Sequence, residues 1–263
     1  MDIVKNFENK DNIFTAITSG DIQRVLKEIL NTPVAHVNRI EFLSKTFGIS
    51  ESDIVNKQAN ISFDVRKKAA NKQINSTVIQ TSSISLASGI PGGPAMAATI
   101  PGDILQNMVY SVRLAQQLAF IYDINIEEND EIDIDKLLLF LGTMFGVNSA
   151  AALLRVTSTN TGKYLSKKIL SAGLSKTVWF PIFKKIVRIV SGKTLTIKTL
   201  SKSATKIVPI FGGVASGGMT YFAMKKSAKR LNEELQKGFD GIYSEDDYQK
   251  DLETLDGEFL ELE

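Results

Sequence analysis

The chain of 263 residues has no cysteine and only one histidine, His36. Without cysteine there can be no disulfide, no thiolate metal site and no cysteine nucleophile. A single histidine excludes zinc sites built from several histidines and leaves Ser-His-Asp chemistry dependent on His36 alone. No neighbouring residue completes a catalytic set, so we interpret His36 as a residue at the edge of a helix's apolar stripe, with a backbone or solvent partner. We therefore expect no metal, no cofactor and no catalytic residue, which favours a non-enzymatic protein.

Carboxylates are missing from a long part of the chain. Residues 136–232 contain no Asp or Glu but 17 of the 31 Lys and Arg residues. Acidic stretches flank this span, with seven carboxylates in residues 123–135 and twelve in residues 233–263. The formal net charge of +2 therefore hides a strong separation of charge. Such fields influence solubility, steering and surface binding.

Long hydrophobic runs are also scarce. Two segments, residues 137–154 and 207–224, are free of charge for 18 residues each. A helix needs about 20 mainly apolar residues to span a membrane, so both are borderline, and Gly, Ser, Thr or Asn dilutes each. A buried helix and a membrane contact both fit these segments. Residues 1–12 are polar and lack an apolar core, so no secretory signal is expected.

Apolar residues recur mostly at helical spacing, which predicts an all-α fold, a single compact multi-helix domain with glycine-rich apolar helices and a small N-terminal helical part. Helices are expected over residues 21–31 and 33–48, with His36 on the stripe of the second and Gly48 as its C-terminal cap. Residues 50–53 resemble a capping box. We divide the chain into an N-terminal helical segment (1–50), a helical domain (51–240) and an acidic tail (241–263).

Residues 73–102 are uncharged, with a Ser- and Thr-rich first half that suits a closely packed helix. The Gly and Pro residues of the second half predict loops and short helices. A strong helix is then expected over 103–122, with Asp103 as its N-cap. Its buried stripe is expected to consist of Ile104, Met108, Val112, Ala115 and Ala119. Residues 125–135 are expected to form an exposed acidic loop and residues 225–239 an exposed helix, while the acidic tail is either loosely ordered or a docking element.

Phosphate-binding, nucleotide-binding and hydrolase motifs are missing from the sequence. Two glycine-rich stretches instead resemble the EcsC family, a helical bacterial group without an established activity. In the first, a glycine-rich segment precedes Pro-x-Asp and a helix that ends in Ala-x-x-Tyr; in the second, a Pro-x-x-Gly helix has a basic end. The residues that carry the resemblance are Gly92, Gly93, Pro101, Asp103, Ala119, Tyr122, Pro209, Gly212 and Gly213.

The resemblance covers roughly residues 60–240, and the chain departs from it at Asp123, where the family commonly has Gly. The family's namesake is encoded beside an ABC transporter implicated in secretion, so the resemblance implies work near a membrane. It brings no catalytic residues.

We therefore expect a cytoplasmic protein, peripheral at the inner face of the cell membrane, that contacts anionic lipid or a membrane protein. Lysine-rich amphipathic helices with Trp and Phe suit an anionic lipid interface. The residues expected to make this contact are Lys167, Lys168, Trp179, Lys184, Lys185 and Arg188.

Two other functions stay open. One is a membrane-perturbing effector, pore-forming or of a toxin or defence type, that inserts residues 137–154 and 207–224 as a hairpin. Another is an enzyme that uses Asp103 in a glycine-rich pocket. Nucleic-acid binding is disfavoured because long apolar stretches interrupt the basic residues. The sequence leaves homo-oligomerisation open.

Overall fold

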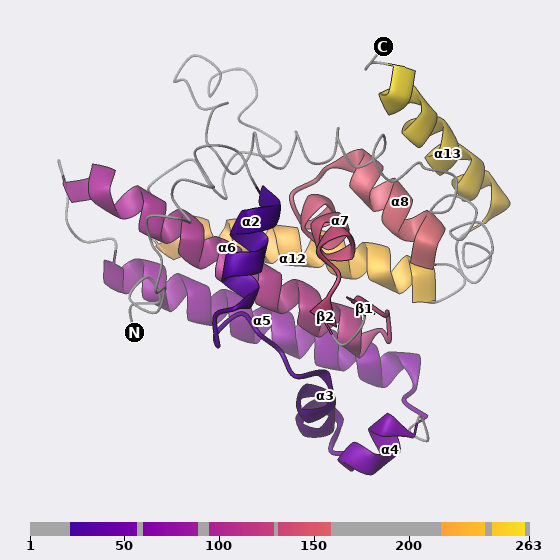
Figure 1. Cartoon of the computed structure of the whole chain (residues 1–263), viewed down its shortest axis with the longest axis horizontal. Coiled ribbons are helices and arrows are strands. Elements are labelled where there is room, and N and C mark those ends of the chain that lie inside the picture. The colour runs from indigo at the N-terminus through magenta and orange to yellow at the C-terminus, as the bar shows by residue number, and fades with distance from the viewer. Residues whose placement is uncertain are drawn as a thin grey trace.

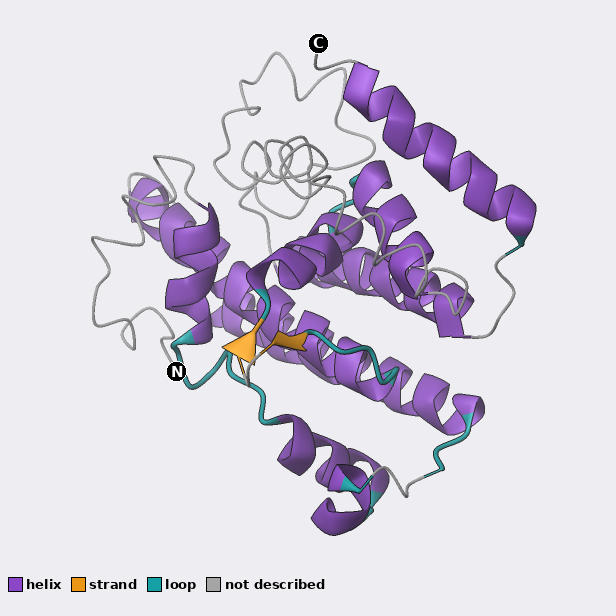
Figure 2. Ribbon diagram, turned by 45° about the vertical axis from the view of Figure 1, so that its right-hand side comes forward, coloured by secondary structure: helices purple, strands orange, loops and turns teal. Residues whose placement is uncertain are grey.

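The computed structural model describes residues 22–56, 60–88, 95–128, 131–158, 217–239 and 244–260. This part of the chain is mostly helical, and its only strands form one short hairpin (Figures 1 and 2), which confirms the all-α prediction. The helices are α2 (Ile22–Leu30), α3 (Arg39–Phe47), α4 (Glu51–Val55), α5 (Phe63–Ser88), α6 (Ala95–Ile121), α7 (Ile134–Met144), α8 (Asn148–Ser158), α12 (Gly217–Phe239) and α13 (Glu245–Leu260). The division of the chain at 50/51 and 240/241 stays a prediction.

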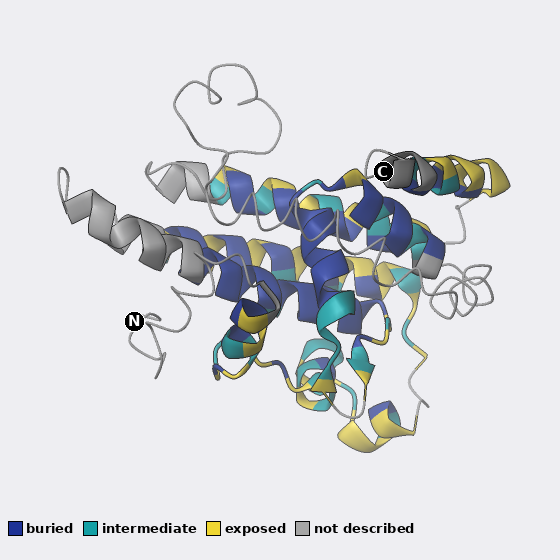
Figure 3. Cartoon of the chain, turned by 45° about the horizontal axis from the view of Figure 1, so that its top comes forward, coloured by how far each residue is buried: buried dark blue, intermediate teal, exposed yellow. Residues whose placement is uncertain are grey.

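Three long helices, α5, α6 and α12, form the centre of the bundle (Figure 1). Helix α12 packs most extensively against α5 and also contacts α6, α7 and α8. Buried residues gather where these helices meet, whereas most of α4 and the outer side of α13 are exposed (Figure 3). Met108, Val112, Ala115 and Ala119 are buried, as their helical spacing predicted. The side chain of Ile104, the fifth residue of that stripe, lies outside the description.

Helix α6 begins earlier than predicted. It starts at Ala95 and continues through Pro101 and Gly102, so Asp103 lies inside the helix and is not its N-cap. Proline inside a helix removes one hydrogen bond and is usually unfavourable by about 3 kcal/mol. The burial of the α6 stripe against neighbouring helices compensates for that cost. The expectation of loops and short helices is therefore wrong for residues 95–102, and residues 89–94 lie outside the description.

The N-terminal helices agree with the sequence at most of their ends. Helix α2 matches the expected span, and Gly48 ends α3 with φ +68°, a left-handed conformation that glycine adopts easily. The side chain of Ser50 caps α4 by accepting from the backbone N–H of Asp53. Helix α3 was predicted too long, because it begins at Arg39 with Asn38 as its N-cap. His36 therefore lies before the helix and is exposed. Its backbone N–H donates to the carbonyl of Thr32.

The Ser- and Thr-rich stretch continues α5 to Ser88, as its small residues suggested. The acidic loop contains two antiparallel two-residue strands, β1 (Glu127–Glu128) and β2 (Glu131–Ile132), a hairpin that the sequence did not indicate. The acidic tail is not loosely ordered over residues 245–260, because α13 is a helix that packs against α8.

The charge-free segment 137–154 is divided between α7 and α8. The two helices are separated at Gly146, which has φ +81°. A Cβ atom at this position would lie 2.7 Å from Nη1 of Arg230, and the same nitrogen donates to the carbonyl of Met144 at 2.9 Å. Among the described residues, no helix combines the length and the apolar character that crossing a membrane requires. Most of the second charge-free segment, residues 207–216, lies outside the description.

Candidate functional site

All six residues predicted from the sequence to touch a membrane lie outside the described residues. These are Lys167, Lys168, Trp179, Lys184, Lys185 and Arg188, together with the motif residues Gly92, Gly93, Pro209, Gly212 and Gly213. For Pro101 and Asp103 the structure describes the backbone, which is helical. The structure therefore brings together only Ala119 and Tyr122 from the predicted set.

Ala119 lies in the last turn of α6, and Tyr122 directly follows this helix. Both are buried, and the hydroxyl of Tyr122 donates to Oδ1 of Asn232 on α12 at 2.8 Å. Burial raises the pKa of Tyr122 to about 12, against a smaller lowering influence of the Gln236 side chain. A neutral tyrosine in this place joins two helices, so the Ala-x-x-Tyr pattern has a structural role in this chain.

The residue after Tyr122 ends the helix. Asp123 has φ +55°, a region that glycine occupies without strain, and this explains why a glycine suits the position. Arg39 donates to Oδ1 of Asp123 at 2.7 Å, and the buried Arg66 donates to the carbonyl of Ile121. Two cations at the negative end of the α6 dipole are favourable. Burial lowers the pKa of Arg66, while the charge of Asp123 raises it.

An exposed aromatic and basic surface lies on the N-terminal half of α12. We call it the α12 patch and define it by five residues, Tyr221, Phe222, Lys225, Lys226 and Lys229. The side chain of Phe222 is 72% exposed, more than that of any other large apolar residue that the structure describes. Phe222, Lys226 and Lys229 are exposed and follow one another at i, i+4 and i+7, so they share one face of the helix.

Contacts within the α12 patch hold its aromatic rings beside positive charge. The rings of Tyr221 and Phe222 meet edge to face with centroids 5.5 Å apart. Nζ of Lys225 lies 5.1 Å from the centroid of the Tyr221 ring and donates to its hydroxyl at 3.0 Å. No carboxylate occurs on α12 before Glu233, so the sequence supplies no local counter-charge. The patch therefore offers an apolar ring and several cations to a solvent-side partner.

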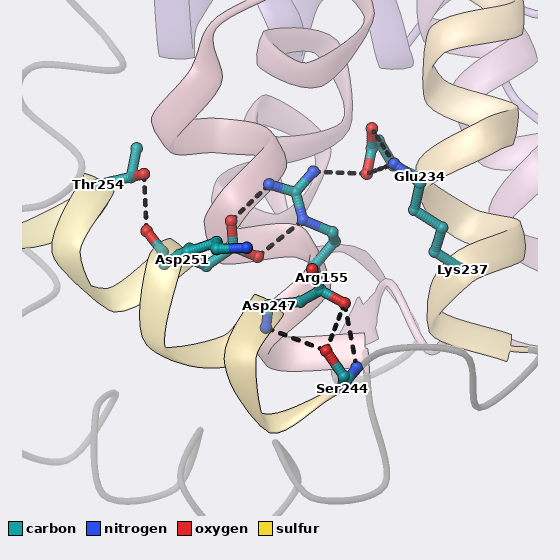
Figure 4. Close-up of polar contacts among 8 residues, drawn as sticks. Arg155, Glu234, Lys237, Ser244, Asp247, Asp251 and Thr254 are labelled. Atoms are coloured by element: carbon teal, nitrogen blue, oxygen red, sulfur yellow. Dashed lines mark hydrogen bonds and ion pairs between the residues drawn. The ribbon is translucent and has the colours of Figure 1, made fainter.

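Apart from the α12 patch, a cluster of charged side chains joins α8, α12 and α13 (Figure 4). Arg155 donates to both carboxylate oxygens of Asp251 on α13, at 2.7 and 2.6 Å, and to Glu234 on α12 at 2.5 Å. Burial lowers the pKa of Arg155, but hydrogen bonds and charge from Asp251 and Glu234 outweigh it and raise the pKa above its usual value. Because the guanidinium is already engaged by two carboxylates, this cluster holds α13 in place and is not an open binding site.

Two further kinds of site find no support in the part of the chain that the structure describes. It contains no group of three or more His, Cys, Asp or Glu residues able to hold a metal ion. Four buried polar atoms lack a hydrogen-bond partner, on Gln106, Asn107, Gln116 and Ser149. Gln106 and Gln116 are ten residues apart on α6, about 15 Å along the axis, and Ser149 is on α8, so these atoms do not converge on one site.

Comparison with protein-family models, characterised proteins and solved structures gives no match to this chain. The EcsC resemblance accordingly stays a prediction. The sequence reasoning missed the α12 patch because residues 225–239 were interpreted only as an exposed helix. Helix α12 is in fact buried along Ala228, Leu231 and Leu235. The signal that would have revealed the patch is the spacing of Phe222, Lys226 and Lys229 in a stretch without carboxylates.

Proposed function

We propose that the protein is a non-enzymatic helical protein that acts at an anionic membrane surface, as a peripheral protein on the cytoplasmic side. The observation that carries this proposal is the exposure of Phe222 beside lysines that have no carboxylate neighbours on α12. Aromatic side chains with a cationic surround are typical of surfaces that enter an anionic lipid interface. The EcsC resemblance, with its link to a membrane transporter, points the same way.

Lipid headgroups are favoured over an acidic protein because the α12 patch combines a protruding ring with flexible ammonium groups. A lysine stem can extend along apolar surface while its ammonium group stays with water or phosphate. Each Lys near an anionic surface contributes about 1 kcal/mol. Three lysines and one exposed ring are therefore sufficient for reversible binding, which suits a peripheral protein.

The test is co-sedimentation with phosphatidylcholine vesicles, with and without phosphatidylglycerol. The double variant Lys226→Glu, Lys229→Glu should weaken binding to anionic vesicles by at least about thirtyfold, since two favourable contributions become repulsive. Its matched control is Lys67→Glu, Lys68→Glu, which changes the net charge equally at two exposed positions near the start of α5. The control should keep most of the binding.

Salt and lipid composition separate the remaining outcomes. Binding through the α12 patch should weaken between about 0.1 M and 1 M salt, because the Debye length falls from about 10 Å to about 3 Å. If both double variants bind like the unchanged protein, the patch is not the contact. Salt-insensitive binding to neutral vesicles, with release of a trapped dye, would instead favour the membrane-perturbing effector. If neither kind of vesicle is bound, the proposal fails.

A further inference from the structure

We propose that the protein meets the bilayer end-on, with the C-terminal half of α5 entering the lipid interface beside the α12 patch. This inference rests on the proposed membrane function and adds the orientation and a second contact element. Figure 1 shows the C-terminal end of α5 and the N-terminal ends of α6 and α12 at one end of the bundle, with α4 and α13 toward the other end.

Three hydrogen bonds fix the relative heights of the central helices. Gln73 on α5 donates to Gln117 on α6 at 2.9 Å, Ser111 on α6 donates to the sulfur of Met224 on α12 at 4.0 Å, and the Tyr122–Asn232 bond joins α6 to α12 farther along. The bond from Arg66 to the carbonyl of Ile121 gives a second level for α5 and α6, which are therefore antiparallel, while the other two bonds show that α6 and α12 are parallel.

These heights place a second exposed apolar side chain level with the α12 patch. Ile79 lies six residues beyond Gln73, about 9 Å along α5, and Ser111 lies the same distance along α6 from Gln117. Ile79 is therefore level with Ser111, and through Met224 with the neighbouring Phe222. Its side chain is 60% exposed. Two protruding apolar residues at one height can enter an interface together.

The part of α5 beyond Ile79 is suited to leaving water. No charged residue occurs between Gln73 and Gly102. Thr81 and Ser82 are already buried within the bundle, and the exposed Ser83 donates its hydroxyl to the carbonyl of Ile79 at 2.8 Å. A polar group that is already hydrogen-bonded loses much less on leaving water than one that is not.

The opposite end of α5 is different in charge. Val65 is also exposed, at 46%, and lies on the same side of the helix as Ile79, because fourteen residues make nearly four turns. Asp64, Lys67 and Lys68 surround it in the sequence and are exposed. Charged groups resist transfer into lipid, so this end should stay in water. Ile79 and Val65 form a matched pair of probes about 21 Å apart.

The absence of cysteine allows each position to carry a single environment-sensitive dye. Ile79→Cys and Val65→Cys, labelled with a nitrobenzoxadiazole group, are mixed with vesicles of phosphatidylcholine and phosphatidylglycerol in equal parts. The dye at position 79 should brighten several-fold and shift to the blue, while the dye at 65 stays unchanged. In unlabelled protein, Ile79→Ser should weaken vesicle binding by about tenfold, which corresponds to about 1.4 kcal/mol, and Val65→Ser should not.

Sedimentation of the labelled proteins distinguishes the two levels of failure. If the protein binds but position 79 stays in water, or position 65 responds equally, the end-on orientation is overturned and the proposed function stands. If the unchanged protein does not bind, the proposed function fails and the orientation fails with it. Both substituted positions are exposed, and circular dichroism verifies that each variant is folded.

Discussion

Replacing Arg155 by Met should release α13 from the rest of the bundle. The change removes the one cation that the carboxylates of Asp251 and Glu234 share, and these side chains are only 8% and 13% exposed. Breaking a buried ion pair by removing one partner typically costs 3–5 kcal/mol. Glu234 keeps a contact with Lys237 at 3.2 Å, so we expect the lower end of that range, about 3 kcal/mol.

The free energy in question is that of opening α13 locally, because this helix packs mainly against α8. Hydrogen exchange measures such local opening. A loss of about 3 kcal/mol should reduce the protection of α13 amides by roughly a hundredfold or more, while amides in the centre of α6 change little. The α6 amides serve as the internal reference, since the stripe around Ala115 is fully buried.

Two milder variants compare how much Asp251 and Glu234 each contribute to holding α13. Asp251→Asn removes the charge that accepts two hydrogen bonds and should cost about 1.5–3 kcal/mol, while Glu234→Gln removes a single bond and should cost less. The double variant Arg155→Met, Asp251→Leu should recover part of the loss, because apolar residues often replace a buried ion pair without harm. Protection in Arg155→Met within about threefold of the unchanged protein, or strictly additive losses, would refute the reasoning.

Three other changes test features of the fold. Burial raises the pKa of Tyr122 above its unfolded value of about 10, so the stabilising effect of the neutral hydroxyl is complete below pH 10 and is lost as the pH rises through about 12. In urea unfolding, the unchanged protein should therefore lose about 1.4 kcal/mol of stability between pH 10 and about pH 11, whereas Tyr122→Phe should not show this loss. Gly146→Ala should lower stability by about 2 kcal/mol in thermal melts, since φ is +81° and Arg230 must move, whereas Gly48→Ala, with open space around it, should cost about 1 kcal/mol. Asp123→Gly should stay within about 0.5 kcal/mol of the unchanged protein, because relief of the left-handed strain offsets a surface ion pair, while Asp123→Val should cost about 1–2 kcal/mol.

The sequence predicted those helix ends that depend on local chemistry. Gly48 and Ser50 act as caps because a left-handed glycine and a hydroxyl beside a free N–H need only their neighbours in the chain. The start of α6 was missed because Pro101 and Gly102 disfavour a helix locally, and only packing against distant helices reverses that preference. The break at Gly146 was missed for a similar reason, since the turn depends on Arg230.

The candidate surface on α12 was less accessible from sequence than the fold class. Charge counting located the carboxylate-free span correctly, but it could not tell which of its lysines are exposed beside an aromatic ring. Lys226 and Lys229 face solvent because the opposite side of α12 buries Ala228 and Leu231. That distinction requires knowing which neighbours α12 has, and these are α5, α6, α7 and α8, which lie at least 59 residues earlier in the chain.

Helix α12 also has a consequence for the order in which the chain can fold. Within five residues it supplies Arg230 to the end of α7, Asn232 to the end of α6 and Glu234 to α8. A ribosome completes these three helices well before it makes α12, so each emerges with a polar group whose partner does not yet exist. The earlier helices therefore reach their final packing only when residues 217–239 arrive, and a chain that stops before them should be prone to aggregation, because the apolar faces of α6, α7 and α8 would stay uncovered.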